Sequence, residues 1–252
     1  MMRPDIVVLR EFYGTILGRF VRAQLAQKVR KHWVDTREDV MLGLGYTTPI
    51  LRFFIRQPEL KRNVIAVMPR AQGGMVWPTR GDSRAMMAEP DALPLPNNSV
   101  HRALMLHTLE FSEDPHAVMR ECFRVLTPGG RMLVCVPNRR SIWSAAQGTP
   151  FGYGTPYTIA QLRQLVAAAG FSVMHYETAL YLPPYQSKIL LRIAPWLEWI
   201  GAWILPHAGG VVMMEIEKQI YAGIREPLKK SGKKIAWYPL GEGAPSTRVH
   251  GE

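Results

Sequence analysis

The sequence predicts a single α/β domain built on a seven-stranded, mostly parallel sheet, with extensions at both ends. Short apolar segments of strand length alternate with helical patterns between residues 39 and 181. Hydrophobic residues make up 47% of the 252 residues, enough for a sizeable core. Strands that alternate with helices form parallel sheets with right-handed crossovers, so this alternation predicts the α/β class.

The first 37 residues are expected to form a helical extension. Apolar side chains recur at three- and four-residue steps from Leu9 to Leu25, while basic side chains occupy the other faces. This spacing predicts one amphipathic helix. We expect the helix to pack on the core, and binding of a partner is the alternative.

Five candidate strands and two helices follow in order. Near-continuous apolar runs are typical of buried parallel strands. The helix over 115–126 ends before the turn residues Thr127 to Gly130, and a second helix begins at the capping residue Thr158 and stops at Gly170. The candidate strands are residues 39–45, 63–68, 84–88, 100–106 and 131–137.

The chain after Gly170 adds two strands, 171–181 and 211–221, and the last is expected to run antiparallel near the edge of the sheet. Between them the Trp-rich stretch 183–210 predicts two short helices, the second starting at Pro195. Its tryptophans, Trp196, Trp199 and Trp203, fall on one face. That face either covers the sheet or contacts a protein partner or an anionic membrane surface.

The domain predicted from these elements spans residues 38–222, and residues 223–252 are expected to form a mobile basic tail. The net charge of +11 is partly concentrated in the two terminal segments. A basic surface favours nucleic acid, anionic lipid or an acidic protein, but no nucleic-acid-binding module is visible, so no specific nucleic-acid partner is expected. The two cysteines give neither a disulfide framework nor metal-ligand spacing. Without a visible secretory signal or spanning segment, we expect a cytoplasmic protein.

Several ordered motifs carry a resemblance. Residues 89–101 (EPDALPLPNNSVH), 110–115 (EFSEDP) and 120–131 (RECFRVLTPGGR), with the ending Ala-Ala-Gly-Phe171, follow one another in the expected order. Together they resemble the class I S-adenosylmethionine (SAM) methyltransferases, of the type 11-like group, over roughly residues 38–182. The resemblance implies a Rossmann-like sheet, SAM as the cofactor and an insertion of helices before the last strand.

Carried over by motif, the resemblance implies a cofactor site with degenerate motifs. Gly43 and Gly45 take the first two glycine positions of the turn after the first strand, and Thr47 stands where the third belongs. Met68 stands where a ribose-binding acid is usual. The full predicted cofactor set is Gly43, Gly45, Tyr46, Met68, Glu89 and His107.

The region after the fifth strand is the candidate substrate region. Arg139 and Arg140 suggest an anionic group, and they share this region with Trp143 and Phe151. A packed lid loop is the alternative. His107 and Tyr153 are the candidate catalytic residues, because a His at the carboxyl edge of the sheet can act as a base.

The resemblance therefore implies a SAM-dependent methyltransferase that acts on a small molecule or a lipid-like acceptor. The alternative is a catalytically degenerate protein of this fold that serves as a binding or regulatory subunit, and a third possibility is a site completed by a partner. Conceivable partners are a glyoxalase II-type hydrolase and a second copy of the chain. Peripheral contact with a membrane is also compatible with the Trp-rich face.

Overall fold

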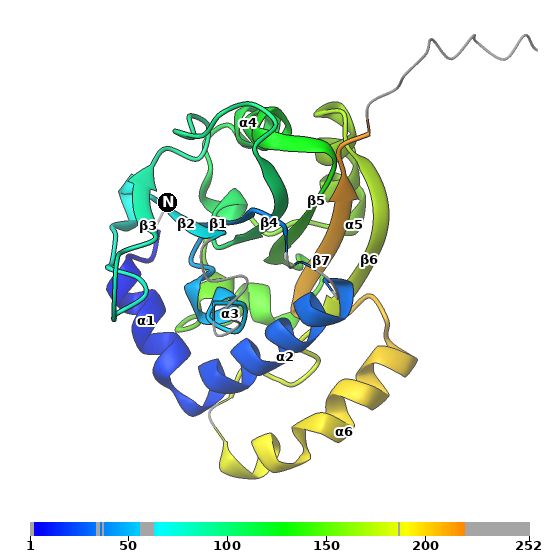
Figure 1. Ribbon diagram of the computed structural model, residues 1–252. Helices are drawn as coiled ribbons and strands as arrows, with labels where there is room; N and C mark the ends of the chain where they lie inside the picture. Colours follow the sequence, from blue (N-terminus) through cyan, green and yellow to red (C-terminus); the bar gives the residue numbers. More distant parts are fainter. Residues whose placement is uncertain (1–2, 34–35, 37, 56–62, 186, 220–252) are drawn as a thin grey trace, which may run out of the picture. The chain divides into compact units, whose positions relative to one another are not determined.

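The computed structural model in Figure 1 describes residues 3–33, 36, 38–55, 63–185 and 187–219. Seven strands form one sheet in the order β3-β2-β1-β4-β5-β7-β6. The strands from β3 to β5 are parallel to one another, and β7 is antiparallel to both of its neighbours. The strands are β1 Met41–Gly45, β2 Val64–Pro69, β3 Ala85–Ala88, β4 Val100–Leu106, β5 Leu126–Pro137, β6 Ser172–Ala179 and β7 Val211–Glu217.

The predicted fold class is confirmed, and the antiparallel last strand lies next to the edge strand β6. The strand boundary that differs most from the prediction is the start of β5, which begins at Leu126 and includes the predicted turn. The N–H of Gly129 donates to the carbonyl of Lys218, and the N–H of Lys218 donates to the carbonyl of Gly130. Pairing with the chain just beyond β7 therefore draws the turn into the sheet.

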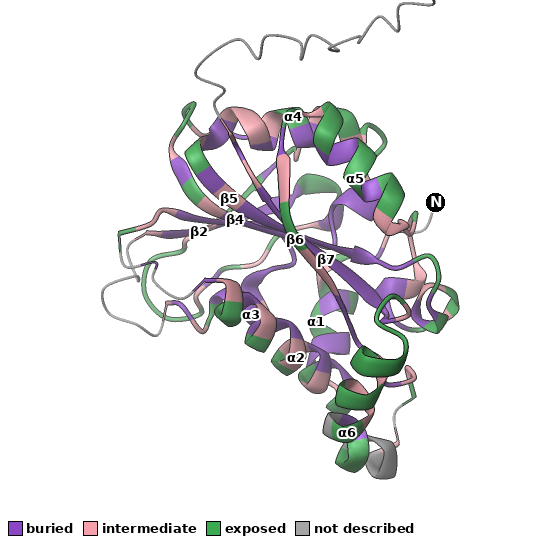
Figure 2. Ribbon diagram, turned by 90° about the vertical axis from the view of Figure 1, so that its right-hand side faces the viewer, coloured by how far each residue is buried: buried purple, intermediate pink, exposed green. Residues whose placement is uncertain are grey.

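Helices cover both faces of the sheet, as Figure 2 shows. On one face, α4 (Pro115–Val125) and α5 (Ile159–Ala168) bury their apolar stripes in a first core cluster. The predicted cap of α5 is present as a capping box between Thr158 and Gln161. The other face is covered by α1 (Ile6–Gly14), α2 (Ile16–His32) and α3 (Thr48–Leu51), which bury the second cluster.

The single N-terminal helix of the prediction is wrong, because the chain forms two helices separated by Thr15. Thr15 has extended backbone angles, and its hydroxyl accepts a hydrogen bond from the N–H of Gly18, which caps α2. A side chain on Gly18 would meet the carbonyl oxygen of Phe12 at 1.9 Å, so the glycine permits the tight approach of α1 to α2. Both helices share a core with the sheet.

The prediction of two short helices in the Trp-rich stretch is also wrong. One helix, α6 (Lys188–Ile204), runs through Pro195 and lies beyond α2, away from the sheet (Figure 1). Its carboxylate Glu198 turns inward and accepts hydrogen bonds from the backbone N–H groups of residues 180–182. Trp196, Trp199 and Trp203 are 68%, 68% and 79% exposed, so their face does not cover the sheet.

Within the described residues, no helix combines the length and apolar character needed to cross a membrane. The compact unit that contains the sheet is Met1–Ile220. The predicted tail 223–252 lies outside the described residues.

The motifs that carry the resemblance meet at the start of β4. The guanidinium of Arg124 on α4 donates to the carbonyls of Leu93 and Leu95 and to the side chain of Asn97. Glu121, one turn earlier, accepts from the N–H of Leu93 and from Arg124, and the latter bond holds its pKa below the usual range. Glu121 and Arg124 of α4 therefore hold the loop between β3 and β4 in place through these hydrogen bonds.

Candidate functional site

A pocket of about 390 Å³ lies at the carboxyl end of β1, between the N-terminal helices and the loop after β2. This volume falls within the range of small-molecule sites, roughly 300–1,000 Å³. The carboxyl edge of a parallel sheet is also where ligands bind in open α/β folds. The lining residues are Arg10, Tyr13, Gly14, Arg22, Tyr46, Thr48, Pro49, Arg52, Ile55, Met75, Trp77, Pro78 and Thr79.

The lining residues that the structure describes give this pocket, called the arginine pocket below, a positive charge. It contains Arg10, Arg22 and Arg52 and no Asp or Glu among the residues that line it. Burial raises the pKa of Tyr46 to about 12, although Arg10 and Arg22 pull in the opposite direction. The Tyr46 phenol therefore stays neutral and can donate a hydrogen bond. Guanidinium groups suit a carboxylate or phosphate, which they can bind in a bidentate manner.

The two motif glycines pack against the protein itself. A Cβ on Gly43 would meet the Thr47 hydroxyl at 2.1 Å and a methyl of Leu51 at 2.3 Å. Gly45 has a φ of +84° and faces Thr108 and the carbonyl of Leu106. The two glycines therefore allow close packing of the turn on α3 and on the end of β4, and their contact with the cofactor stays a prediction.

Two buried polar atoms near this edge have no hydrogen-bond partner within the described residues, the hydroxyl of Thr47 and the side-chain oxygen of Gln72. Thr47 belongs to the turn after β1, and Gln72 follows β2. The amide nitrogen of Gln72 donates to the carbonyl of His107. Buried groups without partners are uncommon, and they mark positions where a ligand or an ordered water completes the bonding.

His107, predicted as both a catalytic and a cofactor residue, is fully buried and does not line the pocket. Its Nε2 lies 2.9 Å from the Tyr13 hydroxyl, and its Nδ1 lies 3.2 Å from Oε1 of Glu110. The other oxygen of Glu110 accepts from the N–H of Thr108. Burial raises the pKa of Tyr13 well above its ordinary value. Since Tyr13 lines the pocket, a hydrogen-bonded chain connects the pocket wall to His107 and Glu110.

The predicted cofactor set does not share one cavity. Tyr46 lines the arginine pocket, whereas Met68 borders a separate pocket of about 270 Å³, and Met75 lines both. Glu89 is exposed on the loop after β3. Sequence reasoning missed Arg10, Tyr13 and Trp77. The basic side chains on the first helix were a signal for Arg10, but they were not linked to a site.

The predicted substrate residues divide into two groups. Trp143 and Phe151 are buried and pack edge to face, and the Trp143 indole donates to the carbonyl of Leu182. Both side chains belong to the core and neither lines the arginine pocket, so their substrate role stays a prediction. Arg139 and Arg140 are exposed, and Arg139 donates to the carbonyl of Pro156. Tyr153 is half-buried and lies outside the arginine pocket, so its catalytic role stays a prediction.

Comparison with known proteins gives one match to a family model and many similar folds. The model of a methyltransferase domain matches residues 42–134, which include most of β1, the contacts of Arg124 and most of β5. The fold is similar to that of a SAM-dependent methyltransferase from Thermotoga maritima, with a TM-score of 0.57 and 18% identity, over 83% of this chain and 94% of that one. Residues 42–134 are thus similar to a methyltransferase domain, and the fold around them is the fold of the solved methyltransferase.

Curated relatives of the methyltransferase domain match parts of the chain. A probable SAM-dependent methyltransferase of Mycolicibacterium smegmatis is 39% identical over 83 residues, or 32% of each protein. A malonyl-[acyl-carrier protein] O-methyltransferase of Alcanivorax borkumensis is 30% identical over 161 residues, covering 62% of this chain and 54% of that protein. The chain spans about a third of the length of the mycobacterial relatives that it matches.

Proposed function

We propose that the chain is a SAM-dependent methyltransferase that binds its cofactor in the arginine pocket and acts on a small-molecule or lipid-like acceptor. The single observation that supports this most is the position of the pocket, at the carboxyl end of β1 and against Tyr46 of the motif turn. The N-terminal helices complete the pocket with basic and aromatic side chains.

The residues of the pocket fit a SAM molecule in two respects. The guanidinium groups of Arg10, Arg22 and Arg52 suit the carboxylate of its methionine part, and the rings of Tyr46 and Trp77 suit its adenine. The usual ribose-binding acid is replaced by the buried Met68. A charge-assisted hydrogen bond is worth about 1.5–3 kcal/mol, so we expect weaker binding than in relatives that keep the acid. Bound SAM supplies a methyl group activated by a sulfonium.

The chain's own contribution to the reaction is the Tyr13–His107–Glu110 chain. The phenol of Tyr13 is hydrogen-bonded to Nε2 of His107, and Glu110 orients the imidazole through Nδ1. This follows the arrangement in which a base is held by a third group. In the proposed role, Tyr13 accepts the proton of an acceptor hydroxyl as its own proton passes to His107. His107 is then the final proton acceptor.

The acceptor class follows from the charge of the pocket and from one relative. The Alcanivorax relative is named for O-methylation of malonyl-[acyl-carrier protein]. A carboxylate or hydroxyl group on a short or acyl chain suits the positive charge of this pocket wall. These two observations support the proposal of an O-methyltransferase that acts on an anionic or lipid-like acceptor.

Transfer of a labelled methyl group from SAM to a panel of acceptors tests this function. The panel contains hydroxy acids, fatty acids and a malonyl thioester. We expect transfer to one class. With a hydroxyl acceptor, kcat should be lowered about 100-fold in Tyr13→Phe, in line with the usual contribution of acid–base catalysis, whereas a carboxylate acceptor is already ionised and should show no such loss. The matched control Tyr185→Phe removes an exposed hydroxyl outside the pocket and should leave kcat unchanged. Tight SAM binding without transfer to any acceptor would instead favour the regulatory-subunit alternative.

A further inference from the structure

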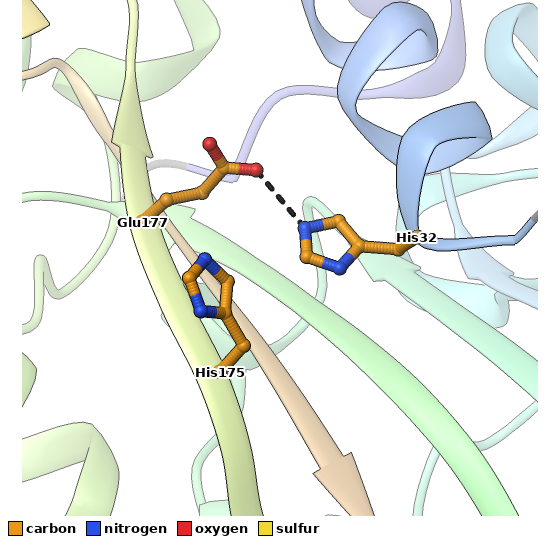
Figure 3. A group of neighbouring side chains, drawn as sticks. All are labelled: His32, His175 and Glu177. Carbon is orange, nitrogen blue, oxygen red and sulfur yellow. Dashed lines mark hydrogen bonds and ion pairs between the residues drawn. The ribbon is translucent and has the colours of Figure 1, made fainter.

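A cluster of two histidines and one glutamate lies apart from the arginine pocket, between α2 and β6. Figure 3 shows His32 from the last turn of α2 facing His175 and Glu177 of β6. One nitrogen of each imidazole and one carboxylate oxygen lie within 4.8 Å of one another. Because His32 is far from the other two in the sequence, no metal-ligand spacing was visible there.

The sheet directs the two β6 ligands to the same side. His175 and Glu177 are two residues apart, so their side chains leave the same face of the strand. The pairing of β6 with β7 is irregular between Val173 and His175, and His175 lies opposite Glu215 of β7. Irregular pairing of this kind re-aims side chains and is frequent next to functional sites. His32 approaches this face from α2.

The hydrogen bonds of His32 match those of a metal-bound histidine. Its Nε2 lies 3.0 Å from Oε1 of Glu177, the atom beside which an ion would sit. Its Nδ1 lies 3.2 Å from Oε2 of the buried Glu215. In metal sites, the ring nitrogen that does not bind the ion is almost always held by a carboxylate, a carbonyl or water. Glu215 supplies that carboxylate.

We propose that His32, His175 and Glu177 bind a divalent transition-metal ion of the zinc class. Two imidazoles and one carboxylate are a common protein ligand set for zinc, with water in the fourth position. Two nitrogen ligands disfavour calcium and magnesium, which prefer oxygen. The ion takes the place of the proton shared by His32 and Glu177. His175 is exposed and the other two ligands are half-buried, so solvent ions can enter.

The surrounding charges are compatible with an added cation. Lys28 pairs with the second oxygen of Glu177, and Arg131 lies 3.7 Å from Oε1 of Glu215. These contacts leave Oε1 of Glu177 for the ion and hold the carboxylates in place. The bound ion would join α2 to β6, and α2 also carries Arg22 of the arginine pocket. The site itself does not depend on the proposed methyltransferase activity.

Calorimetric titration of the untagged, chelator-treated full chain with zinc chloride tests the proposal. We expect one ion per chain, a melting temperature that rises with zinc concentration, and an affinity at least tenfold lower in His175→Ala. Glu215→Gln should weaken binding by about 10–100-fold, as loss of a carboxylate behind a ligand histidine does. His116→Ala is the matched control, because His116 is exposed on α4, on the other face of the sheet.

The metal-free variants are compared by circular dichroism, and since His175 is exposed, His175→Ala should keep the wild-type fold. The absence of zinc binding in the wild type would overturn the proposal. Equal affinity in the wild type and in His175→Ala would do so as well, because the zinc would then bind elsewhere. Calcium chloride serves as a second probe, and saturation by calcium at the same concentration would contradict the assignment to a transition metal.

Discussion

Gly45→Ala is expected to destabilise the protein by about 4 kcal/mol, although it adds a single methyl group. Overpacking a well-packed core costs typically 1–3 kcal/mol, and the left-handed backbone adds about 1–2 kcal/mol for any residue with a side chain. The new Cβ would lie 2.1 Å from the Thr108 hydroxyl and 2.2 Å from the carbonyl of Leu106. Thermal unfolding should show a fall in melting temperature of roughly 8–16 °C.

Gly129→Ala separates the two causes. Gly129 also has a positive φ, +71°, but no atom lies within 4 Å of the position that its Cβ would take. The control should therefore lose only the backbone contribution of about 1–2 kcal/mol. Equal losses in the two variants would show that the end of β1 is not packed against the end of β4 as described.

Glu110→Ala should cost about 3 kcal/mol, because Glu110 is 1% exposed and both of its oxygens are engaged. The truncation leaves Nδ1 of His107 and the N–H of Thr108 without their acceptor in a dry environment. Removing one partner of a buried polar pair costs the desolvation of the partner that remains. Urea unfolding of the variant and the wild type measures the difference in the free energy of unfolding.

Two further variants test whether the lost hydrogen bonds cause the loss of stability in Glu110→Ala. Glu110→Gln keeps the shape and one acceptor oxygen, so its loss should be smaller than that of Glu110→Ala. Glu113→Ala removes an exposed carboxylate from the same loop and should change stability by less than about 0.5 kcal/mol. A loss in Glu110→Ala no greater than in Glu113→Ala would contradict a closed Tyr13–His107–Glu110 chain.

The sheet was predictable because buried parallel strands leave near-continuous apolar runs, and β4 matches its predicted bounds, Val100–Leu106. The break between α1 and α2 at Thr15 could not be predicted in this way. The apolar spacing continues in phase across the break, and only Gly14 and Thr15 interrupt the pattern. At Pro195 the error was the reverse, because a helix boundary was predicted where the structure has one continuous helix. A proline is a frequent first residue of a helix, yet here it lies inside α6.

The site was predictable only where it belongs to the sheet. Tyr46 lines the pocket because it belongs to the turn that ends β1. Arg10 and Tyr13 line the same pocket because α1 packs on the face of the sheet next to the end of β1. The spacing of apolar residues predicts a helix, but it does not predict where that helix packs. Trp143 was predicted as a substrate residue because its loop leaves the carboxyl edge of the sheet, and no sequence pattern indicated that its ring would be buried against Phe151.

Calorimetric titration with SAM and with S-adenosylhomocysteine tests most directly whether the arginine pocket holds the cofactor. We expect one site per chain for both compounds. We also expect an affinity at least tenfold lower in Arg10→Ala/Arg52→Ala, since each lost charge-assisted hydrogen bond is worth about 1.5–3 kcal/mol. Arg19→Ala, which removes an exposed arginine of α2 outside the pocket, should bind like the wild type. No binding of either compound, or equal affinity in the double variant and the wild type, would contradict the account.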